Sequence, residues 1–444
     1  MIAAAPLGHR IRQREVFWWQ VLTVTLLATG YAGYYLCRSN LSVAMPLIVA
    51  ELGVRGMDIN AARVRMGSIA SLGVLAYAIG KFPSGSLADY LGGRRNFLAG
   101  MGGAILFTLL FAISGGIPAF TLAWMGNRML QSLGWAGMIK ITSKWFSFSH
   151  YGTVMAIISL SYLFGDALAR QFMGALIAAG FGWRGLFAVG AGVLGLLLVA
   201  CLLLLRESPA DIGAEEAPTN PANLFHEQEI PSEMNASGGK RLTALLRPFA
   251  RSTTFWLVCA LSLGTTILRE TFGLWTPTYF TQAAGMSAAA AAGNSSLFPF
   301  LGGLSVILCG WLSDRLGRGG RATLMFGGLL LSSGALIAMS VGVTQGSQIL
   351  PVVFVGLVAF FTVGPYSFLA GAISLDFGGK KGSGTASGLI DGIGYLGGVL
   401  SGDSMARISV RYGWNGAFLL LGVIALLSSA AAFVFLIRER KLRS

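Results

Sequence analysis

Two arginines lie inside long apolar segments of this chain. Arg38 interrupts the first apolar segment, and Arg269 lies deep within the first apolar segment that follows the central polar stretch. A guanidinium keeps its proton, so neither side chain can become neutral in order to enter lipid. Placing one at the centre of a bilayer costs about 2.5 kcal/mol or more. A water-filled cavity that holds an anion would offset this cost, and the two arginines therefore predict such a cavity.

A lysine belongs to the same class of candidates, because Lys81 lies well inside the second apolar segment, where it cannot easily reach a membrane surface. For Arg38 an alternative stays open. If the first membrane span covers residues 16–37, Arg38 would extend its side chain to the outer interface. Arg269 has no such alternative, because apolar residues extend far on both sides of it.

Two Asp–Arg pairs are spaced four residues apart within apolar segments, Asp166 with Arg170 and Asp403 with Arg407. Residues at this spacing are neighbours on one face of a helix. Ion pairs within each helix are the favoured interpretation, and proton coupling is the alternative.

Two further acids lie close to the predicted cavity. Glu270 follows Arg269 directly, and a step of one residue rotates a helix by roughly 100°, so Glu270 is expected to contact another helix. Asp391 precedes Tyr395 by four residues and is expected to share its face towards the cavity. A carboxylate there would repel an anion unless an arginine or lysine pairs with it, which indicates either a zwitterionic substrate or a carboxylate gate that competes for the cations.

The elements that carry these residues are membrane spans. The chain is 54% hydrophobic and 11% charged, whereas ordinary soluble domains are about 25% charged. Its apolar residues form runs of roughly 20, the length of a helix that crosses a bilayer. We predict an all-α membrane protein with about twelve such spans: 20–48, 66–88, 96–115, 118–140, 153–178, 184–205, 252–280, 290–312, 323–343, 348–375, 384–408 and 415–437.

The net charge of +14 is concentrated in alternate loops. This distribution follows the positive-inside rule and places both termini in the cytoplasm, rather than indicating a nucleic-acid partner. The exception is the loop after the first span, with Arg55, Arg63 and Arg65. The basic N-terminus runs into a long span without a short apolar core and cleavage site, so no cleavable signal peptide is expected. A multi-pass protein of a bacterial inner membrane is predicted.

No enzyme is expected, because no nucleophile–base arrangement is visible and the three histidines have no metal-ligand spacing. No cofactor and no metal site are predicted. The four cysteines lie in apolar spans, where a cysteine is usually a small hydrophobic residue.

The chain repeats itself after about half its length. GSLADYLGGRR at 85–95 corresponds to GWLSDRLGRGGR at 310–321, and FGWRGLF at 181–187 corresponds to YGWNGAF at 412–418. We therefore predict two six-helix bundles, 1–205 and 251–444, joined by a cytoplasmic linker at 206–250. Parallel halves with a site between them at the membrane midplane are typical of transporters that work by rocking. The repeated loops are predicted to latch one conformation through four residues, or alternatively only to fix the topology: Asp89, Arg94, Asp314 and Arg318.

These features resemble a known family. The two Asp/Gly/Arg loops and the six-plus-six repeat are similar to the major facilitator superfamily. Within it, five segments resemble the organophosphate:phosphate antiporters, which include carriers of glycerol 3-phosphate, hexose 6-phosphate and phosphoglycerate: YAGYYLCRSNLSVAMP (31–46), AYAIGKFPSGSLAD (76–89), LRETFGLWTPTYF (268–280), LCGWLSDRLGRG (308–319) and KKGSGTASGLIDGIGYLGG (380–398).

The resemblance implies a substrate site. Arg38 and Arg269 match the pair of arginines that holds the substrate phosphate in that family, and a guanidinium fork suits phosphate oxygens. Tyr31, Tyr35 and Arg38 share one helix face, although the tyrosines could instead be packing residues. The remaining matched positions are Lys81, Tyr77, Gln131, Trp135, Tyr395 and Tyr162, the last of which stands where the family has a histidine.

Three other positions depart from the glycerol-phosphate branch. Leu274 replaces an aspartate, Pro299 replaces a glutamate, and Ser39 replaces a lysine. These differences put glycerol 3-phosphate in doubt as the substrate, but not the recognition of phosphate.

The resemblance implies a monomeric secondary transporter in a lipid bilayer that exchanges an organic phosphate ester for inorganic phosphate by alternating access. Two alternatives remain. A proton-coupled organic-anion symporter would use the acids, and Asp391 in particular, as proton carriers. A transporter-like sensor of sugar phosphates would need a partner kinase and would show no counterflow.

Overall fold

The computed structural model describes residues 7–146, 148–215, 249–316, 319–369, 373 and 388–441. Within these ranges all regular structure is helical. The first part of the chain forms α1 (Leu7–Leu36), α2 (Asn40–Val54), α3 (Ile59–Leu91), α4 (Gly93–Ile113), α5 (Ile117–Trp145), α6 (Phe148–Ala178), α7 (Trp183–Leu204) and η1 (Pro209–Ile212). The second part forms α9 (Thr253–Gln282), α10 (Ala288–Ser295), α11 (Leu297–Leu316), α12 (Gly320–Ser340), α13 (Ile349–Ser367), a helix described from residue 388 onwards, and α15 (Asp403–Lys441).

Each of the predicted spans coincides with one of these helices or with a pair of them, which confirms the all-α fold class. The first span is divided into α1 and α2, and the eighth into α10 and α11. The eleventh is described from residue 388 onwards and continues into the first part of α15. Gly413, with φ 69°, bends α15 and separates the eleventh span from the twelfth. Seven described stretches have the length and composition of a membrane-crossing helix, one of which joins the last two spans as Gly388–Glu439.

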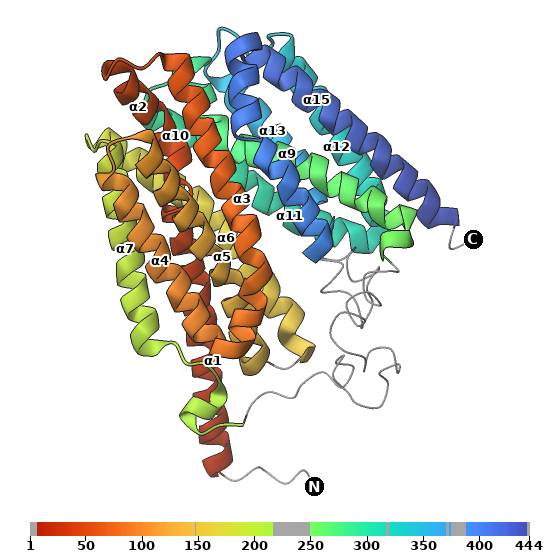
Figure 1. Cartoon of the computed structure of the whole chain (residues 1–444). Helices are drawn as coiled ribbons and strands as arrows, with labels where there is room; N and C mark the ends of the chain where they lie inside the picture. Colours follow the sequence, from red (N-terminus) through yellow and green to blue (C-terminus); the bar gives the residue numbers. More distant parts are fainter. Residues whose placement is uncertain are drawn as a thin grey trace.

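The helices form two groups (Figure 1). Helices α1 to α7 pack mainly on one another, and α9 to α15 do the same. The groups meet where α3 lies against α15, where α6 lies against α10 and α11, and where α2 lies against α9. Most of the predicted linker lies outside the described residues, so the boundaries 1–205, 206–250 and 251–444 stay predictions.

The two groups are closed together at one end of the molecule. Gly67 of α3 and Gly402 face each other there, and a Cβ built on Gly402 would lie 2.4 Å from the Gly67 carbonyl oxygen. Ser71 donates a hydrogen bond to the Val399 carbonyl at 2.5 Å, and Gln171 donates one to the Gly293 carbonyl at 3.1 Å. The start of α1 and the end of α15 lie towards the opposite end, where the two groups of helices diverge (Figure 1).

Tight turns follow the second and eighth spans, as the repeated loops predict. Gly92 (φ 92°) and Gly319 (φ 77°) occupy the left-handed region in the two turns, which glycine enters at little cost. Next to the first turn, Glu207 accepts hydrogen bonds from the backbone N–H groups of Gly93 (2.9 Å) and Arg94 (2.6 Å) and pairs with Lys144 (3.0 Å). Burial alone would raise the pKa of Glu207, but these partners lower it below its usual value. Glu207 therefore stabilises the start of α4, a position that favours negative charge.

Of the four predicted latch residues, only Arg94 has a side chain among the described residues. Arg94 lies at the start of α4, and its guanidinium donates to the Leu202 carbonyl at 2.7 Å. Asp89 and Asp314 lie near the ends of α3 and α11, but their side chains, like the whole of Arg318, fall outside the described residues. The latch at these loops stays a prediction.

Candidate functional site

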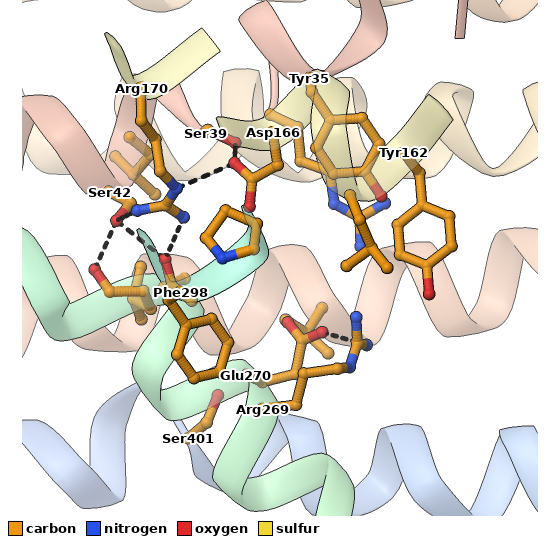
Figure 2. Close-up of a pocket in the computed structure, with 18 of the residues that line it drawn as sticks. Tyr35, Ser39, Ser42, Tyr162, Asp166, Arg170, Arg269, Glu270, Phe298 and Ser401 are labelled. Carbon is orange, nitrogen blue, oxygen red and sulfur yellow. Dashed lines mark hydrogen bonds and ion pairs between the residues drawn. The ribbon is translucent and has the colours of Figure 1, made fainter. Parts of the chain in front are cut away.

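A cavity of about 110 Å³ lies between the two groups of helices. Its wall comes from α1, α2, α3, α5 and α6 on one side and from α9, α11, α13 and the segment just before α15 on the other. Figure 2 shows polar and charged side chains of both groups converging on it. Arg38 and Arg269, the two arginines that predicted a cavity, both line this one.

Arg38 lies in the break between α1 and α2. The backbone N–H of Arg38 bonds to the Tyr35 carbonyl at 3.2 Å, so a tight turn replaces the regular helix here. The Arg38 guanidinium carbon lies 5.4 Å from the ring centre of Tyr35 and 4.7 Å from that of Tyr77, within the range of a cation–π contact. Arg38 therefore faces the cavity between the two groups of helices.

Arg269 lies on the opposite wall and pairs with its own neighbour. Its Nη2 atom donates to Glu270 at 2.5 Å, and its guanidinium carbon lies 4.8 Å from the Tyr366 ring centre. The Nε atom of Arg269 is buried without a hydrogen-bond partner, so part of its donor fork is unused. Glu270 also packs against another helix, as expected, because a Cβ atom built on Gly398 would lie 3.2 Å from Glu270 Cγ. The ion pair with Arg269 was not expected, and it forms because both side chains are long enough to close the angle between adjacent helix positions.

Lys81 and Asp391 connect the two groups of helices. Their side chains form an ion pair at 2.7 Å, with 30% and 26% of each side chain exposed. Asp391 therefore has the cationic partner that its position requires. Tyr77 and Tyr395 lie beside this pair with ring centres 5.5 Å apart, and Lys81 Nζ lies 4.7 Å from the Tyr395 ring centre. This cluster adjoins the cavity through Tyr77, which Arg38 also contacts.

The remaining predicted site residues lie at or behind the cavity wall. Tyr162 lines the cavity and stacks on Tyr35, with ring centres 6.2 Å apart. Tyr31 is buried against Trp135 at 5.6 Å, and Gln131 donates to the Cys37 carbonyl at 3.1 Å. In this conformation Tyr31, Trp135 and Gln131 are not part of the cavity lining, and their role in binding stays a prediction.

Both Asp–Arg pairs form within their helices, as favoured from the sequence. Arg170 Nε lies 2.9 Å from Asp166, and Arg407 Nε lies 2.7 Å from Asp403. Each pair also forms a hydrogen bond with the other group of helices. These contacts were not predicted from the sequence. Arg170 donates to the Gly273 carbonyl at 2.6 Å. Figure 2 shows Arg170 beside Asp166 and Ser42.

The second pair makes an equivalent contact, because Ser68 donates to Asp403 at 2.5 Å. Ser39, which also lines the cavity, donates to Asp166. The two pairs therefore take part in the hydrogen bonds that hold the groups together at their closed end.

One charged residue of the cavity lining was not predicted from the sequence. Arg128 of α5 lines the cavity, is 3% exposed, and has its guanidinium carbon 4.9 Å from the Tyr77 ring centre. It lies near the middle of the predicted span 118–140, so the signal that identifies Arg38 was present for Arg128 as well.

Two groups of membrane-type helices around a polar central cavity define a membrane transporter. The sequence profile of the Major Facilitator Superfamily matches residues 27–402, and the chain belongs to that superfamily. It is therefore a multi-pass membrane protein of a transporter family.

Several named relatives match nearly the whole chain. It is 27% identical over 438 residues to the probable hexose phosphate transport protein of Chlamydia pneumoniae, which covers 96% of this chain and 92% of that protein. It is 27% identical over 417 residues to the glycerol-3-phosphate transporter of Bacillus subtilis, covering 92% and 89%. It is also 27% identical over 442 residues to the membrane sensor protein UhpC of Salmonella typhimurium, covering 98% and 96%. These matches confirm the resemblance inferred from the sequence motifs.

The fold has solved counterparts. A bacterial homologue of the human lysosomal transporter Spinster, in an inward-facing and unoccupied conformation, superposes with a TM-score of 0.73 at 14% identity, covering 95% of this chain and 98% of that one. A POT family transporter superposes with a TM-score of 0.68 at 14% identity, covering 94% and 96%.

Proposed function

We propose that this protein exchanges an organic phosphate ester for inorganic phosphate across a membrane by alternating access. The observation that carries the proposal is the presence of Arg38 and Arg269, one from each group of helices, on one shared cavity. The names of the relatives support phosphate esters as the substrate class. The cell inner membrane, cytoplasmic termini and a monomeric state belong to the same proposal.

The two guanidinium groups give a physical reason for exchange. Without an anion, the cavity carries an excess of positive charge, because Arg269 pairs with Glu270 whereas Arg38 has no ion pair. This excess disfavours a conformation in which the cavity is closed at both ends. A phosphate that contacts both arginines neutralises them and favours closure around itself. The protein then changes its orientation mainly when it is loaded, which makes transport an obligatory exchange.

Counterflow in proteoliposomes tests the proposal. Vesicles loaded with inorganic phosphate are expected to take up external labelled phosphate, and a substrate ester is expected to inhibit this uptake. Empty vesicles with an imposed pH gradient are the control. Uptake that needs the pH gradient but no internal phosphate would support the symporter instead, and binding without any counterflow would support the sensor that the UhpC relative represents.

Asp391 is expected to compete with the substrate for Lys81. In the Asp391→Asn variant Lys81 loses its ion-pair partner at 2.7 Å, so the cavity gains one uncompensated positive charge. We expect the dissociation constant for phosphate to fall by up to about fivefold, since a partly exposed pair contributes about 1 kcal/mol. The exchange rate should fall as well, because release becomes slower. Isothermal titration and counterflow measure the two effects, and weaker phosphate binding in this variant would contradict the competition.

A further inference from the structure

The charges around the cavity do not balance, and the imbalance lies on one wall. Five cationic side chains and three carboxylates of the described residues surround the cavity or adjoin it. Each carboxylate has a cationic partner: Asp166 with Arg170, Glu270 with Arg269, and Asp391 with Lys81. Among the described cations around the cavity, Arg38 and Arg128 form no ion pair of their own. Glu270, which pairs with Arg269, is the carboxylate that faces both of them.

Both of these guanidinium groups lie against the ring of one tyrosine. The guanidinium carbon lies 4.7 Å from the Tyr77 ring centre in Arg38 and 4.9 Å from it in Arg128. The two guanidinium carbons are therefore less than about 10 Å apart. Both line the same cavity, whereas Tyr77 itself does not. Arg38 and Arg128 belong to the first group of helices, so their relative position does not depend on how the two groups are oriented.

The surrounding residues hold Arg128 in this position. Its stem packs on Gly73 of α3, where a Cβ atom would lie 3.1 Å from Arg128 Cγ and 2.4 Å from the Trp124 ring. The missing side chain at Gly73 thus leaves the space through which Arg128 reaches the cavity. A buried charge without a partner is costly, so a cation held in this way needs an anion.

We propose that Arg128 is a third phosphate-binding residue, which forms with Arg38 an anion clamp within the first group of helices and selects the dianionic form of the phosphate group. The clamp binds the phosphate first, and Arg269 contacts it from the opposite wall. The inference rests on the proposed function, and it deepens that function by naming the charge state of the substrate.

The excess of positive charge gives the reason why the clamp would select the dianionic form of phosphate. Two cations without acidic partners are neutralised by one dianion, whereas a monoanion leaves a positive charge in a poorly solvated cavity. The second ionisation of inorganic phosphate falls close to neutral pH. The affinity of the wild-type protein for total phosphate should therefore rise with pH through this ionisation. Sulfate, which stays a dianion throughout, should bind with little dependence on pH.

The test compares phosphate and sulfate binding by isothermal titration, one pH unit below and one above the second ionisation of phosphate. In Arg128→Gln we expect phosphate affinity at the higher pH to fall about 10- to 100-fold, the range of a hydrogen bond to a charged group. The rise of phosphate affinity relative to sulfate with pH should also disappear. Arg128→Lys keeps the charge, so it should retain the pH profile with an intermediate affinity. Arg411→Gln removes an exposed charge beside Tyr412, outside the cavity, and should match the wild type.

The outcomes separate this inference from the function on which it rests. If the wild type binds and exchanges phosphate but all the Arg128 variants keep its affinity and pH profile, the clamp is wrong and the proposed function stands. If Arg128→Gln and Arg128→Lys lose binding equally, Arg128 acts through its shape, which also overturns the clamp. If the wild type binds no phosphate, both proposals fail. Should Arg128→Gln not fold, the pH profile of Arg128→Lys decides.

Discussion

Replacing either Arg38 or Arg269 by lysine is expected to reduce phosphate exchange at least about 100-fold, since two charge-assisted hydrogen bonds of a fork are replaced by a point charge. Both residues line the central cavity, and lysine retains the positive charge. Any loss therefore reports the shape of the guanidinium group rather than the electrostatic potential alone. Counterflow of labelled phosphate in proteoliposomes measures the effect.

Arg411→Lys serves as the matched control, because it makes the same change at an exposed position and should leave exchange unaltered. Full exchange activity in Arg38→Lys or in Arg269→Lys would refute the proposed mechanism. Such a result would mean that the phosphate is held elsewhere or by charge only.

A valine at position 402 is expected to abolish exchange while leaving the protein folded and able to bind phosphate. Gly402 faces Gly67 at the closed end, where a Cβ atom would lie 2.4 Å from the Gly67 carbonyl oxygen and 2.5 Å from the Ser71 hydroxyl oxygen. Backbone atoms cannot yield to such a contact, so the two groups of helices would have to separate at this end. The variant should then remain open on the side that is closed in the structure.

Electron–electron resonance distances measure this opening. Spin labels at Asn60→Cys and Ala290→Cys, one on each group of helices near the closed end, should move apart in Gly402→Val, with the native cysteines replaced in all samples. Gly192→Val is the matched control, because nothing lies within 4 Å of a Cβ built there. Unchanged distances together with normal exchange would show that the close approach of Gly402 and Gly67 is not needed for closure.

The spans were predictable because each must bury a long run of apolar residues in lipid, and such runs are visible in the sequence. The break at Arg38 was not predicted, although the sequence carries a signal for it. Ser39 is the N-cap residue of α2, and serine is a residue type preferred at helix starts. A charge inside an apolar segment identified Arg38, Lys81 and Arg269 as candidates, and the same criterion applies to Arg128.

Contacts between side chains were less predictable than positions. The ion pair of Lys81 with Asp391 joins a helix of the first group to a helix of the second. No local sequence pattern specifies such a contact. The contact between Arg269 and Glu270 shows the limit of helical periodicity. The angle between adjacent positions describes the Cα–Cβ directions, whereas two long side chains can bend towards each other.

The central claim is that one phosphate contacts both Arg38 and Arg269, and an experimental structure of the protein with inorganic phosphate tests it most directly. The account predicts phosphate density within hydrogen-bond distance of both guanidinium groups, with the unused Nε of Arg269 among the donors. Phosphate held by Arg38 and Arg128 alone, with Arg269 still bound only to Glu270, would contradict it.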